Sequence, residues 1–328
     1  MGLRAAVLAI DAGNSKTDAA FVAADGTVLA SGRAGGFRPP AVGVASAVDV
    51  LGEAVDRALA GARSAGAPLV GAEHVSAALA NADLPVEEAE LAAAVGDRGW
   101  GRTTEVRNDT FAVLRAGLDE PRGVAVVCGA GINCAGMLPD GRTARFPALG
   151  RLSGDWGGGG GLAEEALWCA ARAEDGRGEP SELARLLPAH FGLPSVHALI
   201  EALHLGGIAP PRRHELVPVL FAASTAGDLV ARALVRRQAE EVVAMAAVAL
   251  GRLELLDEPA PLVLGGSVLA SRHPQLHADI AEFLADRAPK AVVHLVTAPP
   301  VLGAALLGMD AIGAGPKARE RLRAHYAG

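Results

Sequence analysis

The sequence predicts an α/β fold built from two related domains. Short apolar runs that end in glycine-containing turns alternate with longer segments whose apolar residues recur at helical spacing. The order of strand, small-residue turn and strand at residues 5–22 recurs at 124–138. A chain of 328 residues also suits two domains better than one. We place the boundary so that the domains cover residues 1–117 and 118–328.

The first of these segments reads as three short strands joined by tight turns. Its apolar runs cover residues 5–10, 19–22 and 28–30, and Asp11 ends the first run. The backbone N–H groups of the turn after Asp11 can surround phosphate oxygens, and the Asp11 carboxylate can hold Mg²⁺, directly or through water. The alternative is an ordinary turn closed by an aspartate. The expected phosphate-binding residues of this turn are Gly13, Asn14, Ser15, Lys16 and Thr17.

Two later turns extend this pattern. Strand 124–128 runs into a small-residue turn, strand 134–138 follows, and a third turn comes directly after strand 262–264. Two glycine turns that face one nucleotide, with a third at its adenosine end, would form a complete nucleotide site. The residues expected in it are Gly129, Ala130 and Gly131 of the second turn, and Gly265, Gly266 and Ser267 of the third.

The remaining segments alternate between helical and strand patterns. Residues 44–63 carry apolar positions at helical spacing, and Pro85 is placed to open a helix. We expect the last helix to cross back onto the first domain. The expected helices cover 44–63, 85–95, 110–117, 162–174, 228–256, 303–308 and 316–327, and further strands cover 74–79, 104–107 and 290–296.

Composition and charge narrow the class of protein. Hydrophobic residues make up 51% of the chain and aromatic residues only 3%, so the cores must be aliphatic. The formal net charge of −7 gives no electrostatic footprint for a nucleic acid, and no apolar run approaches the ~18–20 residues of a membrane span. The beginning of the chain lacks the features of a signal peptide, and the three cysteines form no C-x-x-C pair. We expect a cytoplasmic protein that binds neither nucleic acid nor membrane.

Together, these motifs resemble the actin, hexokinase and Hsp70 ATPase superfamily, and in finer detail its N-acetylglucosamine kinase branch, grouped with the BadF/BadG/BcrA/BcrD-type ATPases. The resemblance implies two actin-like, ribonuclease H-like domains with a nucleotide and sugar cleft between them. It also implies ATP and Mg²⁺ as cofactors, an amino sugar as substrate and a homodimer. The segments that carry it are DAGNSKTD at 11–18, NDTFAVLRAG at 108–117, GVAVVCGAGINC at 123–134, GRLSGDWGG at 150–158, LVLGGSV at 262–268 and PPVLGAALL at 299–307.

Asp109 is the expected catalytic base. Phosphoryl transfer to an alcohol needs a carboxylate that accepts the hydroxyl proton, and in the resembled kinases the acid of this Asn-Asp motif has that role. The alternative is a helix N-cap, a common use of Asp after a strand; Asp83 has the same alternative at the helix near Pro85. The residues expected to contact the sugar are Arg38, Asn81, Asp83, Asn108, Asp109, Asn133, Gly150 and Asp155.

Two departures from the family pattern concern the sugar. Arg38 or Pro39 stands where the resembled kinases carry an asparagine, and Leu149 stands where they carry a tryptophan. The Arg38 guanidinium could donate two hydrogen bonds to sugar hydroxyls or to a carboxylate. That would admit an acidic or an unacetylated amino sugar.

The glycine run 157–161 opens directly into an expected helix. It is either a turn that lets the backbone approach a ligand closely, with a helix N-terminus that favours an anion, or a flexible linker. Trp156, just before the run, either stacks on a sugar ring or packs in the core.

We therefore expect an ATP-dependent kinase that converts N-acetylglucosamine to N-acetylglucosamine 6-phosphate. Glucosamine or another amino or acidic sugar is the first alternative. The second is the ATPase activator of a CoA dehydratase or reductase-type enzyme. Such activators hold an iron–sulfur cluster with cysteines, and the three cysteines of this sequence do not follow a comparable pattern. A sugar-sensing repressor would need a DNA-binding domain ahead of the strand that starts near Arg4, and a filament-forming ATPase would not need Asp109.

Overall fold

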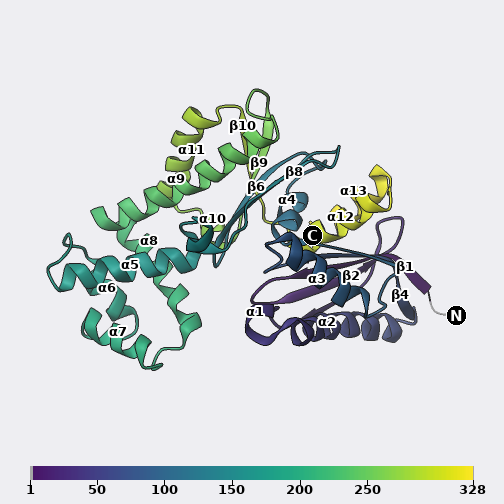
Figure 1. Ribbon diagram of the computed structural model, residues 1–328, viewed down its shortest axis with the longest axis horizontal. Helices are drawn as coiled ribbons and strands as arrows, with labels where there is room; N and C mark the ends of the chain where they lie inside the picture. Colours follow the sequence, from purple (N-terminus) through teal and green to yellow (C-terminus); the bar gives the residue numbers. More distant parts are fainter. Residues whose placement is uncertain (1–2, 328) are drawn as a thin grey trace. The chain divides into compact units, whose positions relative to one another are not determined.

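The computed structural model describes residues 3–327, in which strands and helices alternate along the chain (Figure 1). It contains two five-stranded sheets, in the orders β3-β2-β1-β4-β5 and β10-β9-β6-β7-β8, which confirms the predicted α/β class. The strands of the first sheet are β1 (Leu3–Ala12), β2 (Thr17–Val22), β3 (Val28–Ala34), β4 (Leu69–Leu79) and β5 (Thr103–Asn108). Those of the second are β6 (Gly123–Cys128), β7 (Ile132–Met137), β8 (Thr143–Arg145), β9 (Ala260–Gly265) and β10 (Ala291–Leu295).

The chain forms two compact units. The first contains the chain up to Ala125, the hairpin segment Ala135–Pro147 and the chain from Val296 onward; the second contains Val126–Cys134 and Ala148–Leu295. This division differs from a single cut after residue 117, because the C-terminal helices belong to the first unit. The helix expected at 316–327 is α13 (Pro316–Tyr326), and it lies in that unit.

Strand β1 is buried on both faces at the centre of the first unit. Leu8 and Ile10 face the core formed with α2 (Val44–Ser64) and α3 (Pro85–Gly96). Val7 and Ala9 face the opposite core, formed with α12 (Pro300–Ala311). Because side chains alternate along a strand, one apolar run supplies both layers of the unit.

Helix α12 lies unusually close to its neighbours in this unit. A Cβ atom at Gly303 would overlap the backbone of Ala112 in α4 (Thr110–Ala116). The Ser76 hydroxyl of β4 donates to the carbonyl of Ala304 at 2.8 Å. Small residues therefore allow α12 to pack directly on α4 and on the sheet.

The second unit contains most of the helices between β8 and β10. The long helix expected at 228–256 is α9 (Leu229–Arg252), which Asp228 caps by accepting the N–H of Ala231 at 2.8 Å. The helix expected at 162–174 begins earlier, as α5 (Gly158–Glu174), so four of the glycines are helical. The other helices are α6 (Leu183–His190), α7 (Val196–His204), α8 (Leu216–Thr225), α10 (Ser267–Ala270) and α11 (Pro274–Arg287). Shorter elements are α1 (Pro39–Val42), η1 (Gly150–Ser153) and η2 (Pro210–Glu215).

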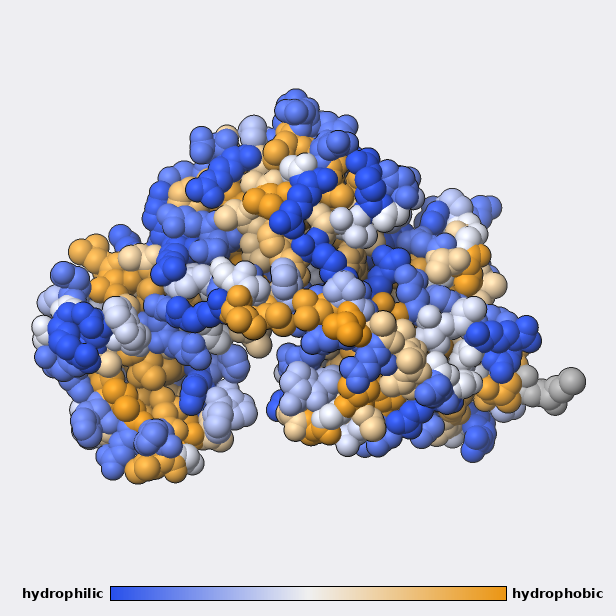
Figure 2. All heavy atoms as spheres, in the orientation of Figure 1, coloured by the Kyte–Doolittle hydropathy of each residue, from blue (hydrophilic) through white to orange (hydrophobic). Residues whose placement is uncertain are grey.

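Polar and apolar side chains are interspersed over the face drawn in Figure 2. Within residues 3–327, no single helix is long and apolar enough to cross a membrane. The pair 210–225 and 229–252 has the required length and composition only when both helices are counted together, and a bend of 112° separates them.

Candidate functional site

Three carboxyl groups meet at one edge of the first sheet. Asp11 lies near the end of β1, Asp83 follows β4, and Asp109 follows β5 as the residue before α4. Strands β1, β4 and β5 run parallel, so their carboxyl ends, and the residues that follow them, lie at the same edge. Asp11 is buried, and Asp83 and Asp109 are half-buried.

Burial raises the pKa of each of these acids. The pKa of Asp11 is raised to about 8 by burial and then by the charges of Asp109 and Asp18. Burial and the charge of Asp109 raise that of Asp83 to about 7, and burial raises that of Asp109 to about 6. A cation brought into this cluster would favour the ionised carboxylates.

Mg²⁺ fits this donor chemistry, because it prefers oxygen ligands and usually keeps several of its waters. In residues 3–327, no group of three or more His, Cys, Asp or Glu side chains is placed to ligate a metal directly. Binding of Mg²⁺ at Asp11, directly or through water, stays a prediction from the sequence.

Asn108 and Asp109 both lie at the start of α4, and Asp109 holds its N-cap position. The side-chain oxygen of Asn108 accepts the N–H of Thr110 at 2.9 Å, while its side-chain amide donates to Asp83 at 2.8 Å. A backbone hydrogen bond from Thr110 also lowers the pKa of the Asp109 carboxyl. The roles of Asp109 as a base and as a helix cap therefore both stay predictions.

The Asp83 side chain does not cap its helix. The carboxylate of Glu87 accepts the N–H groups of Asp83 and Leu84 at 3.0 and 2.9 Å, which closes the start of α3. Asp83 is thereby left to interact with Asn108, beside Asp109.

Neighbouring segments hold the turn at 13–17, for which the sequence predicts phosphate binding; this turn is called the first loop below. The N–H of Gly13 donates to the carbonyl of Lys16 at 2.9 Å and closes the turn. Nε of Arg38 donates to the Asn14 carbonyl at 2.7 Å, and the Asn81 amide donates to the Asn14 side chain at 3.2 Å. The structure therefore brings Asn14, Arg38 and Asn81 together, although they are far apart in the sequence.

Lys16, Thr17 and Ser15 complete this loop. The Lys16 ammonium lies 2.9 Å from Asp18, so it is an ion-paired rather than a purely solvated turn lysine. Burial opposes ionisation of Asp18, but hydrogen bonds from Arg33 and Lys16 hold its pKa below the usual range. Thr17 is fully buried and its hydroxyl has no partner among the described residues, whereas Ser15 is exposed.

A salt bridge between Glu88 and Arg145 contacts the segments that carry Asp83 and Asp109. Glu88 accepts the backbone N–H of Asn108 at 3.0 Å and pairs with Arg145 at 2.7 Å. Arg145 also donates to the carbonyl of Asp83 at 2.9 Å. The pair thus connects the two chain segments that carry Asp83 and Asp109.

In the second unit, the glycine run packs against the turn at 129–131, for which the sequence predicts nucleotide binding; this turn is called the second loop below. The N–H groups of Gly159 and Gly160 donate to the carbonyls of Gly129 and Ala130, each at 2.8 Å. Gly158 has a φ of +69°, and a Cβ there would overlap the backbone of Gly131. The glycine run therefore lies close to the backbone of the turn at 129–131, and its approach to a ligand stays a prediction. The predicted anion site at this helix N-terminus is not supported, because the loop carbonyls occupy these N–H groups.

Gln238 contacts the start of the glycine run, and Gly266 packs against the end of β6. The Gln238 side chain is fully buried and accepts the N–H of Gly158 at 2.8 Å. Gly266 has a φ of +86°, and a Cβ there would overlap the carbonyl of Cys128. Gly265 ends β9 and Ser267 begins α10, so the third turn lies against the strand that leads into the second loop.

The sequence profile of the BadF/BadG/BcrA/BcrD ATPase family matches residues 8–308. The chain belongs to this family. N-acetylmuramic acid/N-acetylglucosamine kinase from Clostridium acetobutylicum is 24% identical over 301 residues, which cover 92% of this chain and 97% of that protein.

Solved structures share the fold of this BadF/BadG-type chain. A protein from Chromobacterium violaceum, proposed to be an N-acetylglucosamine kinase, has a TM-score of 0.72 at 23% identity and covers 92% of this chain and 98% of its own. A ROK-family glucokinase from Streptomyces griseus, solved with glucose and AMPPNP, has a TM-score of 0.54 at 20% identity over 92% of this chain and 98% of its own.

Several expected sugar-contact residues of this ATPase-family chain lie in its second unit. Asn133 accepts the N–H of Cys134 at 2.7 Å. Asp155 accepts the hydroxyl of Ser153 at 2.6 Å, and its N–H donates to the Gly150 carbonyl at 3.0 Å. These hydrogen bonds join residues that are close in the sequence, and they stabilise local turns of the second unit.

Trp156 packs within the second unit. It is 6% exposed, and the guanidinium of Arg237 lies 4.2 Å from the centre of its ring. Of the two interpretations of this tryptophan, the structure therefore favours core packing over stacking on a sugar.

Sequence reasoning missed Glu88, Arg145 and Gln238. Glu88 and Arg145 lie in α3 and β8, and no motif joins the two segments. Gln238 lies within the long helix α9. A glutamine among the buried positions of that helix is a signal that could have been used, because a buried amide needs hydrogen-bond partners.

Proposed function

We propose that this chain is an ATP-dependent kinase that transfers the γ-phosphoryl group of Mg-ATP to a hydroxyl of an amino sugar. The observation that carries the proposal is the half-buried carboxylate of Asp109, which lies next to Asp11 and Asp83. Membership of the BadF/BadG/BcrA/BcrD ATPase family supports the use of ATP.

In this proposal, Asp109 accepts the proton of the sugar hydroxyl. The hydroxyl oxygen of the sugar bonds to the γ-phosphorus of ATP, while the bond between the γ-phosphorus and the β-phosphate oxygen breaks and ADP leaves. A base with a pKa of about 6 is ionised at neutral pH and still basic enough to accept the proton. Asp11 would hold Mg²⁺, which neutralises charge on the phosphates. We assign nucleotide binding to Gly13, Asn14, Ser15, Lys16, Thr17, Gly129, Ala130, Gly131, Gly265, Gly266 and Ser267.

We propose N-acetylglucosamine as the substrate and its 6-hydroxyl as the acceptor. The names of the relatives from Clostridium acetobutylicum and Chromobacterium violaceum support an N-acetylated amino sugar. Asn81, Asp83 and Asn108, which lie beside Asp109 or the first loop, are proposed to contact sugar hydroxyls. Asn133, Gly150 and Asp155 are proposed as further sugar contacts on the strength of the family resemblance.

An acidic amino sugar such as N-acetylmuramic acid is the second candidate. Arg38 is exposed, and within residues 3–327 it donates a hydrogen bond only from Nε, to the Asn14 carbonyl. Its two terminal nitrogens are therefore available to a carboxylate. The alternative of an iron–sulfur-bridged activator lacks such support, since Cys128 and Cys134 are buried and burial raises the pKa of both thiols. A homodimer and a cytoplasmic location stay predictions from the sequence.

A coupled assay of ADP release with Mg-ATP tests the proposal. The panel contains N-acetylglucosamine, glucosamine, N-acetylmannosamine, N-acetylmuramic acid and glucose, with a reaction without sugar as the control. We expect release that depends on one N-acetylated amino sugar, and a phosphorylated product detectable by mass spectrometry. ATP binding without transfer to any member of the panel would contradict the proposal.

A further inference from the structure

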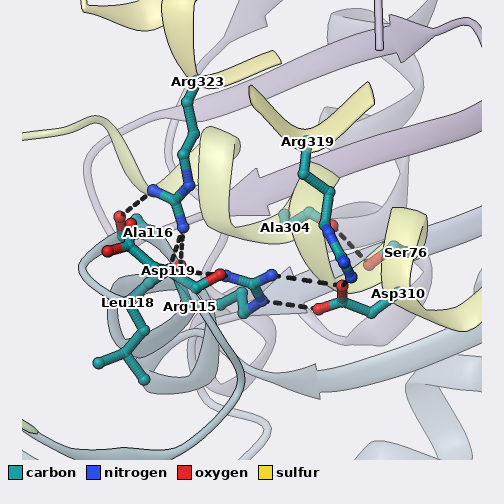
Figure 3. A network of polar contacts seen from close by, with 9 residues as sticks. All are labelled: Ser76, Arg115, Ala116, Leu118, Asp119, Ala304, Asp310, Arg319 and Arg323. Carbon is teal, nitrogen blue, oxygen red and sulfur yellow. Dashed lines mark hydrogen bonds and ion pairs between the residues drawn. The ribbon is translucent and has the colours of Figure 1, made fainter. Parts of the chain in front are cut away.

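The short helix α4 ends in a fully buried arginine. Arg115 is 0% exposed; its Nε donates to Asp310 of α12 at 2.6 Å and its Nη1 to the carbonyl of Leu118 at 2.7 Å (Figure 3). Arginine is almost never fully buried unless it is paired. This end of α4 is therefore fixed by specific polar contacts rather than by apolar packing alone.

A second arginine, from the C-terminal helix α13, caps the same end of α4. Arg323 donates to the carbonyls of Ala116 at 2.9 Å and of Arg115 at 3.2 Å, and also to the carbonyl of Leu118 (Figure 3). The last carbonyls of a helix have no partner within the helix, and a cation there also interacts favourably with the helix dipole. Arg323 therefore supplies the C-terminal cap of α4 from a segment far along the chain.

Asp310 joins these contacts into one network. Its carboxylate accepts from Arg115 of α4 and, at 2.9 Å, from Arg319 of α13. Together with the close approach of Gly303 to Ala112, both C-terminal helices therefore hold α4.

The opposite end of α4 carries the proposed base. The helix has only seven residues, about 10 Å in length, and Asp109 directly precedes it. So short a helix has little stability of its own and depends on its tertiary contacts. A displacement at its C-terminal end would therefore move Asp109.

We propose that Arg323 is a positioning residue for catalysis: by capping α4, it fixes the place of the Asp109 carboxylate relative to Asp11 and Asp83. The inference rests on the proposed function in so far as Asp109 is the base. According to this proposal, helix α13 influences catalysis indirectly, through α4, although no residue of α13 belongs to the proposed site.

Arg323→Ala, compared with Arg321→Ala, tests the proposal. Arg321 lies on the same helix and pairs with Asp25, and both side chains of that pair are more than half exposed. We expect Arg323→Ala to lower kcat about ten- to a hundredfold while KM for Mg-ATP changes less than about twofold. Arg321→Ala should leave both unchanged, and Arg323→Lys, which keeps the charge and can still donate, should be intermediate.

The second readout is the pKa of Asp109 in the full-length chain, measured by carbon-13 NMR titration without substrate. The carboxyls of Asp11 and Asp83 face Asp109, and their titration is followed in the same spectra. In Arg323→Ala, the pKa of Asp109 should fall from about 6 toward its ordinary value, because a displaced carboxylate gains solvent. Should that variant not fold, Arg323→Lys provides the same measurement.

The outcomes separate the two proposals. An unchanged Asp109 pKa in every folded Arg323 variant would overturn the positioning role, whatever the enzyme acts on. A shifted pKa in a protein that phosphorylates no sugar would support the positioning of Asp109 and count against the proposed function alone.

Discussion

The side-chain amide of Asn108, the last residue of β5, donates at 2.8 Å to the carboxylate of Asp83, which follows the neighbouring strand β4. The same asparagine accepts the first N–H of α4. Asn108 thus connects the start of the helix to Asp83, directly beside Asp109. This position of the Asp109 carboxylate next to Asp83 underlies the first prediction.

Asp109→Asn should lower kcat by about 10²–10⁴ while leaving the Kd for Mg-ATP nearly unchanged, because the amide cannot accept the hydroxyl proton. Stopped-flow or coupled kinetics and calorimetric ATP binding measure the two effects. Asp97→Asn, at an exposed position after α3, is the matched control and should be fully active. Full activity in Asp109→Asn would remove the proposed base.

The rate should also depend on the ionisation of Asp109. Its pKa is about 6 before substrate binds, so kcat/KM should rise with pH through that value as the carboxylate forms. A pH profile of kcat/KM for the wild type, measured at Mg-ATP and sugar concentrations well below KM, checks this. A profile that is flat between about pH 5 and 7 would contradict the assignment.

Asp11 should make the metal-free protein less stable at high pH. Its pKa rises from an ordinary 3.8 to about 8 on folding, so between these values the folded chain holds a proton that the unfolded chain has released. The stability contributed by this proton is complete below pH 4 and is lost as the pH rises through 8. Asp11→Asn, which mimics the protonated acid, should therefore have a Tm that is less sensitive to pH between 5 and 8.

Differential scanning fluorimetry of both proteins, without metal or nucleotide, measures this difference. Mg-ATP should raise the Tm of the wild type more than that of Asp11→Asn, because binding favours the ionised carboxylate. Equal pH dependence in the two proteins would show that Asp11 does not titrate in this range.

Gly158→Ala should displace the second loop. Its Cβ would overlap the Gly131 backbone at a φ of +69°, so we expect a loss of about 2 kcal/mol or more in stability and weaker ATP binding. Gly161→Ala in the same helix is the control, since a Cβ there meets nothing within 4 Å and alanine favours helix by about 1 kcal/mol. Similar Tm and Kd values for the two variants would contradict this role of the glycine run.

Arg38→Ala should change which sugar is preferred. If the terminal guanidinium nitrogens bind a carboxylate, the variant should lose about tenfold or more in kcat/KM for N-acetylmuramic acid and much less for N-acetylglucosamine. Loss of the bond from Nε to the Asn14 carbonyl would affect both sugars alike. The ratio of the two kcat/KM values therefore separates recognition from support of the loop.

Much of the fold could be predicted from local patterns. The strands around Asp11, the helices α2 and α9 and the fold class follow from apolar periodicity and turn residues, which depend only on neighbours in the sequence. The start of α5 could not be predicted this way. Four glycines disfavour a helix on propensity, and the helix forms there because the loop carbonyls accept its first N–H groups.

The α/β class, the three glycine turns, the family and the candidate acids Asp11 and Asp109 could all be predicted from the sequence, because each is encoded in a contiguous motif. The contact of Asn108 with Asp83, and the support of the neighbouring segments by Glu88–Arg145 and Arg323, appeared only in the folded structure. These contacts join residues distant along the chain, and their energies depend on burial and geometry that no local pattern records.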